Sequence, residues 1–238
     1  MSLLTIVQNT CDALGLSRPT AIISSTDAQV RQMLSLSNRG AKLLARQHDW
    51  AVLTKEHTFT TANADADYAF PSDYDRIAMH TAWDRSNYWE IREAIPGFIW
   101  QALKSGIVVP PGLRKSYRIK AVSNARQLFI DPTPTATETL VYEYFSNGWN
   151  QTSGGTAQAA WANDTDTALL DEELLTFDLV WRFRQAQGLG GWEEDYQMCR
   201  NYLELLKAQD KGAAVLSANG MDWHLGQANI QDGSYPSS

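Results

Sequence analysis

Three groups of carboxylates are the first candidates for chemistry in this sequence. Asp73 with Asp75, Asp164 with Asp166, and the acidic run 171–173 each place carboxylates close enough for acid–base catalysis or Ca²⁺ binding. Simpler structural roles exist for them. Aspartate in a turn caps backbone amides, and acidic residues in the first turn of a helix interact favourably with its dipole. We therefore expect these groups to be structural.

The other residue types that carry catalysis or bind metals are scattered along the chain. The 4 histidines do not form the paired ligands of a zinc helix, and neither cysteine stands at ligand spacing. There is no Gly-x-Ser-x-Gly elbow and no phosphate-binding loop ending in Gly-Lys-Ser or Gly-Lys-Thr. We predict no catalytic residue, no metal site and no cofactor, so the chain is not expected to be an enzyme.

Composition and charge narrow the function classes further. Hydrophobic residues make up 44% of the 238 residues, enough for a sizeable core, and the net charge is −7. A general nucleic-acid binder needs a basic face. The net negative charge therefore argues against such a function, although it would suit the wall of a channel that repels DNA. Cys11 and Cys199 are expected to be free thiols in a reducing cytoplasm. We find no secretory signal and no apolar run of the ~20 residues that a membrane span needs, so we expect a soluble protein made in the cytosol.

An aromatic cluster offers a second kind of chemistry. It consists of Trp83, Tyr88, Trp89, Phe98 and Trp100. Exposed Trp and Tyr rings can stack on sugars or bases, whereas buried ones fill cores and oligomer interfaces. We favour core and interface, and keep ligand binding as the alternative.

Four segments with helical periodicity would have to position these residues. They are residues 3–14, 27–47, 171–187 and 192–211. Ser2 and Gly15 can cap the first, and Thr26 can open the second through a capping box with Gln29. We expect residues 1–50 and 168–211 to form a helical bundle.

Between the second and third helices, residues 51–149 are rich in strand-forming residues and predict a β-rich insertion. Residues 150–167 are small and polar and predict a long loop. The predicted fold class is therefore α+β, a four-helix bundle with a β-rich insertion.

Residues 212–238 predict an extended C-terminal arm that orders on a partner. The segment has almost no charge and no helical or strand period, yet it is richer in apolar residues than a solvating tail. A frayed terminus is the alternative. The residues expected to bind the partner are Val215, Leu216, Met221, Trp223, Leu225, Ile230 and Tyr235.

A short motif between two β-like segments connects the chain with a known family. Tyr68-Ala-Phe-Pro-Ser-Asp-Tyr-Asp-Arg76 resembles the Tyr-x-Leu-Pro-x-Asp-Phe-x-Arg segment of the head-to-tail adaptor proteins of tailed bacteriophages, with Phe70 in place of Leu. Trp100-Gln-Ala-Leu-Lys-Ser-Gly106 and Ile130-Asp-Pro-Thr-Pro134 fall where similar segments fall in that family. The residues taken as the fold motif are Tyr68, Phe70, Pro71, Asp73 and Arg76.

The resemblance implies a passive structural role in the neck of the virion. Copies would form a ring, expected to be a dodecamer, that binds the portal protein and continues the DNA channel. The ring would present a docking platform for a downstream tail or nozzle protein, and duplex DNA would pass through its lumen without specific binding. The alternative function is a carbohydrate- or ligand-binding module of a virion that uses the aromatic cluster.

Overall fold

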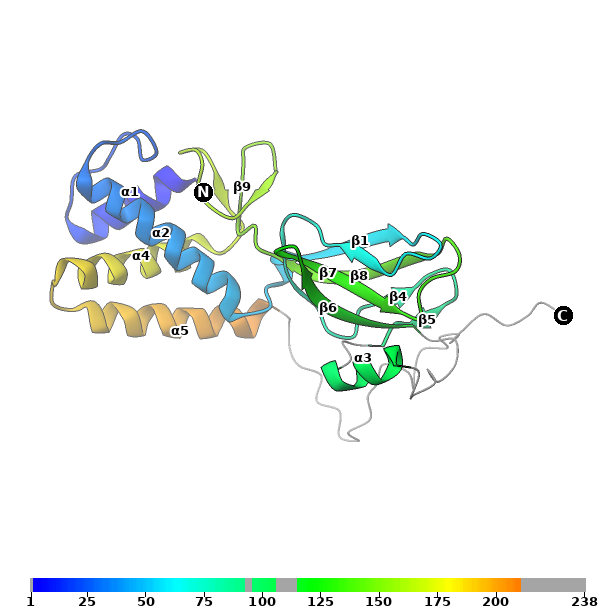
Figure 1. Cartoon of the computed structure of the whole chain (residues 1–238). Helices are drawn as coiled ribbons and strands as arrows, with labels where there is room; N and C mark the ends of the chain where they lie inside the picture. Colours follow the sequence, from blue (N-terminus) through cyan, green and yellow to red (C-terminus); the bar gives the residue numbers. More distant parts are fainter. Residues whose placement is uncertain (1, 93–95, 106–114, 211–238) are drawn as a thin grey trace. The chain divides into compact units, whose positions relative to one another are not determined.

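The computed structural model describes residues 2–92, 96–105 and 115–210 (Figure 1). The expected C-terminal arm lies outside the described residues. The helices are α1 (Leu3–Leu14), α2 (Ala28–Gln47), the short 3₁₀ helix η1 (Ala51–Leu53), α3 (Gly97–Lys104), α4 (Glu172–Gln187) and α5 (Trp192–Asp210). No helix in these ranges is long and apolar enough to cross a membrane.

Short strands make up most of the remaining regular structure. They are β1 (Thr54–Thr60), β2 (Asp67–Ala69), β3 (Tyr74–Ile77), β4 (Trp83–Asp84), β5 (Trp89–Glu90), β6 (Ser116–Val122), β7 (Ala125–Asp131), β8 (Thr139–Ser146), β9 (Asn150–Gln151), β10 (Ala157–Gln158) and β11 (Thr167–Ala168). One sheet has the order β1-β8-β4-β5 with β3 also paired to β8, a second is β2-β7-β6, and a third is β10-β9-β11.

The described chain divides into two compact units. The helical unit contains residues 1–54 and the segment from 145 onward that carries α4 and α5, and the sheet unit contains residues 55–144. Each unit has its own core. The helical core includes Leu3, Leu44, Leu174 and Cys199, and the sheet core includes Leu140, Tyr142 and Tyr144 of β8.

The predicted fold class is wrong. The described residues hold five α-helices and eleven strands in three antiparallel sheets, so the chain is β-rich with a sheet core and is not a four-helix bundle. Each of α1, α2 and α5 packs on α4, and α4 has buried residues on several sides, from Leu174 to Phe183.

The segment 150–167, expected to be a long loop, is mostly exposed or half-buried and is attached to the helical unit's core through Trp161. It contains β9 and β10, and Trp161 packs edge-on against Trp149 with ring centroids 4.8 Å apart. The Trp161 indole donates to the Ser37 hydroxyl of α2 at 3.0 Å. The small polar residues of the segment predict a loop from composition alone. Trp161 is the residue that anchors the segment to the core.

The cap of α2 also differs from the prediction. Asp27, not Thr26, is the N-cap, and its carboxylate accepts from the amides of Gln29 and Val30. A carboxylate at this position satisfies two of the unpaired first-turn amides and also suits the positive end of the helix dipole. Ser2 and Gly15 cap α1 as predicted.

Candidate functional site

The motif at residues 68–76 joins two sheets within the sheet unit. Tyr68 lies in β2, which pairs with β7, whereas Tyr74 opens β3, which pairs with β8. The turn between them closes with a hydrogen bond from the Tyr74 amide to the Pro71 carbonyl at 3.0 Å. Phe70 stacks on Tyr74 with ring centroids 3.8 Å apart. The motif residues therefore fix the crossing from one sheet to the next.

Asp73 lies in this turn and connects it to two strands. Its carboxylate accepts from Lys55 Nζ of β1 at 2.6 Å and from the Tyr144 hydroxyl of β8 at 2.9 Å. Arg76 pairs with the adjacent Asp75 at 3.1 Å. Asp73 thus holds strands together, whereas the Asp75 carboxylate pairs within its own strand, and both contacts are structural.

The other candidate carboxylates are structural as well. Asp164 accepts from the amides of Ile22 and Ile23, and Asp166 accepts from the amides of Ala162 and Asn163. Asp171 is the N-cap of α4. The described residues contain no group of three His, Cys, Asp or Glu side chains that could hold a metal ion.

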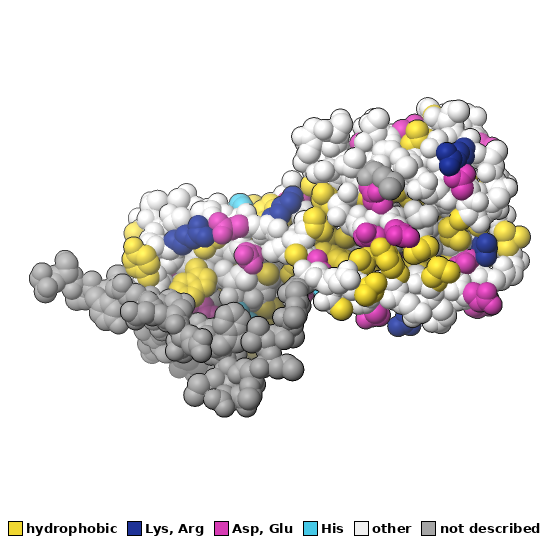
Figure 2. Space-filling model, turned by 180° about the vertical axis from the view of Figure 1, so that it is seen from behind, with side chains coloured by type: hydrophobic (Ala, Val, Ile, Leu, Met, Phe, Trp, Pro, Cys, Tyr) yellow, Lys and Arg dark blue, Asp and Glu magenta, His cyan; other side chains and the backbone are white. Residues whose placement is uncertain are grey.

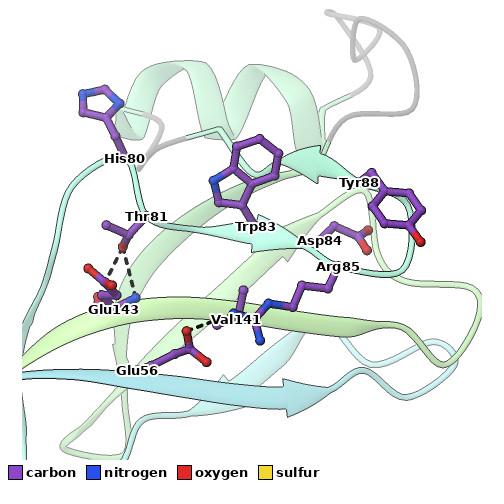
Figure 3. Close-up of a pocket in the computed structure, with 9 residues that line it drawn as sticks. All are labelled: Glu56, His80, Thr81, Trp83, Asp84, Arg85, Tyr88, Val141 and Glu143. Atoms are coloured by element: carbon purple, nitrogen blue, oxygen red, sulfur yellow. Dashed lines mark hydrogen bonds and ion pairs between the residues drawn. The ribbon is translucent and has the colours of Figure 1, made fainter. Parts of the chain in front are cut away.

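A hollow of about 690 Å³ lies on the face of the sheet formed by β1, β8 and β4 (Figure 3). It is lined by Glu56, His80, Thr81, Trp83, Asp84, Arg85, Tyr88, Val141 and Glu143. Arg85 pairs with Glu56 across its floor at 2.9 Å. Aromatic rings beside carboxylates can stack on a flat ligand and accept its hydrogen bonds.

Two residues at the rims of this hollow have an unusual backbone. His80 has φ 60° and Tyr88 has φ 59°, in the left-handed region that residues with a Cβ rarely adopt. Both are bulky, and Tyr88 is 57% exposed. Thr81 stabilises the turn that contains His80, because its hydroxyl donates to the Ala78 carbonyl at 2.8 Å and accepts from the Glu143 amide at 3.1 Å.

A buried ion network supports the hollow from inside the unit. Lys115 Nζ lies 2.6 Å from Asp84 and 2.8 Å from Glu138, and its side chain is only 9% exposed. Burial of the Asp84 carboxyl opposes its ionisation, but hydrogen bonds from Asn87 and Lys115 prevail and hold its pKa below the ordinary value. Burial likewise opposes the ammonium of Lys115, but the bonds to Asp84 and Glu138 outweigh it and raise its pKa. Both groups are therefore charged near neutral pH.

The structure separates the aromatic cluster that the sequence suggested. Trp83 and Tyr88 line the hollow, while Trp100 is 2% exposed and belongs to the interior. Phe98, on the same short helix as Trp100, is 85% exposed. The hollow itself was not predicted, because it depends on β1 and β8 lying beside β4, a pairing between distant segments.

The residues predicted to bind the portal lie outside the described part of the chain. They are Val215, Leu216, Met221, Trp223, Leu225, Ile230 and Tyr235. Their role remains a prediction.

Comparison with known protein families supplies the decisive observation. The family model for the SU10 adaptor protein matches residues 1–227. The chain belongs to this family. It is a family of phage head–tail adaptors, so this adaptor is a structural component of a virion that works with portal and tail proteins. The match includes both compact units and continues beyond residue 211.

A search of the curated proteins gave no match to this adaptor. Members of such a family are typically not enzymes, which agrees with the structural roles found for the candidate carboxylates.

Proposed function

We propose that copies of this chain form a ring, expected to be a dodecamer, beneath the portal of a tailed phage. The ring continues the DNA channel of the portal and presents a platform for a downstream tail or nozzle protein. The observation that supports this most strongly is the family match over residues 1–227, which includes both units. The hydrogen bonds of the candidate carboxylates fit a structural role.

The test is assembly on the portal. Purified adaptor mixed with purified portal should give particles in negative-stain images with an extra ring at one end of the portal. Sedimentation of the mixture should give the number of adaptor copies per portal. Separate sedimentation of the two proteins at all concentrations tested would contradict the proposal.

The C-terminal arm is proposed as the main grip on the portal. Ordering a segment costs about 1–2 kcal/mol per residue in backbone entropy, which burial of its apolar side chains at roughly 25 cal/mol per Å² has to offset. A ring repeats the contact in every copy, so a modest affinity per arm becomes a strong attachment. Deleting residues 213–238 should abolish docking to the portal while the circular dichroism of the helices is unchanged. Normal docking of the truncated protein would show that attachment to the portal does not need the arm.

The lumen is proposed to be walled by acidic or neutral residues so that DNA slides without sticking. The net charge of −7 supports this, since a basic wall would bind phosphates in a salt-dependent manner. The free adaptor should therefore not retard duplex DNA in an electrophoretic assay at physiological salt. Tight retardation under these conditions would contradict an acidic lumen.

Carbohydrate binding is a second candidate function, because Trp83 and Tyr88 line one open hollow beside carboxylates. A sugar-binding adaptor would bind glycans as an isolated protein. A glycan array probed with wild type and with Trp83→Ala distinguishes this candidate: binding that is lost in the variant would support it.

A further inference from the structure

The outward face of α2 carries a stripe of positive charge. Arg31, Arg39, Lys42 and Arg46 are all exposed, and α2 contains no acidic residue. Their spacings of eight, three and four residues place them along one side of the helix over about 22 Å, at 1.5 Å per residue. Within the described residues, Arg31, Arg39 and Lys42 make no ion pair, so this charge is available to a partner.

An exposed leucine lies at the edge of the stripe. Leu43 is 41% exposed, next to Lys42. The opposite side of α2 is buried through Met33, Ala41 and Leu44, and it contacts α4. We name the outward residues Arg31, Arg39, Lys42 and Leu43 the α2 face.

The outward side of α5 has complementary chemistry. Glu193 and Glu194 are exposed in the first turn of α5, and no ion pair engages them within the described residues. Met198 and Leu205 follow on the outward side, and each is 52% exposed. The helix dipole explains acidic residues at this end, but it does not explain two exposed apolar side chains beyond them. We name Glu193, Glu194, Met198 and Leu205 the α5 face.

The two faces belong to helices that pack separately on α4. The contacts of α2 and of α5 are both with α4, and α2 and α5 meet at their ends, where Asp210 accepts from the Ala51 amide and approaches His48 at 3.2 Å. Figure 2 shows a band of hydrophobic side chains flanked by Asp and Glu on the rear of the helical unit. One unit therefore displays two different faces with opposite charge.

We infer that the α2 face of one copy packs against the α5 face of the next copy. Two different and complementary faces on one chain make a head-to-tail contact, which is the kind that generates a ring when its rotation closes. The inference rests on the proposed ring and names the surfaces that would build it.

The spacing along the two faces matches. Arg31 and Leu43 are twelve residues apart on α2, or about 18 Å, and Glu194 and Leu205 are eleven apart on α5, or about 16 Å. With the two helices running in the same direction, this axial match places Leu43 level with Leu205 when Arg31 faces Glu194, with Leu43 about a third of a turn around α2 from Arg31. An apolar contact beside an ion pair that the interface shields from solvent gives both affinity and register.

Cysteine cross-linking tests this register directly. The native Cys11 and Cys199 are 2% and 4% exposed, so a bismaleimide should react mainly with introduced cysteines. Leu43→Cys combined with Leu205→Cys in one chain should give a ladder of covalent oligomers when the adaptor assembles on the portal. The two single variants should give cross-linked dimers only when they are mixed.

A matched control uses the exposed Leu189, which lies on neither face and is 50% exposed. Leu189→Cys combined with Leu205→Cys should give no ladder. A ladder in this control equal to that of the first pair would overturn the inference, because it would show non-specific contact.

Charge reversal tests the electrostatic part. Arg31→Glu, Arg39→Glu and Lys42→Glu in one chain should weaken self-assembly on the portal at least tenfold in apparent affinity. Adding Glu193→Arg and Glu194→Arg to the same chain should restore assembly, since the signs again match.

The outcomes separate this inference from the proposed function. If rings form on the portal but the Leu43→Cys and Leu205→Cys pair gives no ladder, the ring stands and the inferred contact fails. If wild-type adaptor forms no oligomer with the portal, both fail. If charge reversal leaves assembly intact but removes binding to duplex DNA, the α2 face serves nucleic acid and the inference is overturned.

Discussion

The cations of α2 in the helical unit and Lys115 in the sheet unit are placed in opposite ways. The cations of α2 lie on the outside, away from the side of the helix that packs on α4. Lys115 is buried and pairs with Asp84 and Glu138 at strand ends. A long helix such as α2 can hold its place through one continuous buried side, whereas strands of two residues such as β4 and β5 bury too little to hold their positions alone. Outer charges should therefore affect association, and inner charges should affect stability.

The largest expected effect is a loss of stability of the sheet unit when Lys115 is replaced by methionine, with the same replacement at Lys42 of the helical unit as the comparison. Lys115→Met leaves Asp84 and Glu138 buried without their cation and should lower the free energy of unfolding of the sheet unit by about 3–5 kcal/mol. Lys42→Met on the exposed side of α2 should change it by no more than about 0.5 kcal/mol. Urea titrations followed by circular dichroism measure both. Equal losses in the two variants would remove the contrast between the units.

A smaller loss is expected from the close packing of α2 on α4. A Cβ added at Gly40 would lie 1.9 Å from Asp178 Oδ2 and 2.9 Å from Arg182 Nε, so Gly40→Ala should cost about 1–3 kcal/mol. Gly190→Ala is the control, because nothing lies within 4 Å of the Cβ it would add. The same urea titration applies. A neutral Gly40→Ala would mean that the Asp178 and Arg182 side chains move aside at little cost.

Acid should weaken the sheet unit through Asp84. Its pKa is lowered in the folded state, so its ionised form stabilises the fold above the unfolded-state pKa of about 3.9. This contribution is lost as the pH falls through the folded-state pKa. Hydrogen exchange of residues 82–91, measured by mass spectrometry below pH 5, should show progressively easier opening. Asp84→Asn should flatten this pH dependence, and an unchanged dependence would assign it to another carboxyl.

The smallest effect concerns the thiols of the helical unit. Burial raises the pKa of Cys199 to about 12 and also raises that of Cys11, so both stay protonated and shielded at neutral pH. A thiol reagent at pH 8 should label neither in the native protein and both in urea. Rapid native labelling would show that the helical core opens readily despite the burial of both thiols.

Much of the helical unit could be predicted from local patterns. The predicted bounds of α1, α4 and α5 agree with the structure to within about one residue, because apolar spacing and terminal caps are properties of neighbouring residues. The arrangement of those helices could not be predicted in this way. The central place of α4 depends on which partners cover each of its sides, and a pattern within one helix does not identify them.

Less of the sheet unit could be predicted from the sequence. Residues 77–83 fall within the segment predicted to be rich in strands, but β3 ends at Ile77 and β4 begins at Trp83, with the left-handed His80 between them. No local signal marks Lys115 as a buried partner of Asp84, since the two are 31 residues apart. The hollow and the network beneath it arise from pairings between distant segments.

The adjacent ends of the sheet unit have a consequence for how the chain can evolve. The chain enters it at β1 and leaves it at β8, and these two strands are paired, with the Thr61 amide donating to the Glu138 carbonyl at 2.8 Å at their far end. The two crossing points, near residues 54 and 145, therefore lie side by side. A segment with adjacent ends can be removed, enlarged or exchanged by recombination while the helices keep their order and connections.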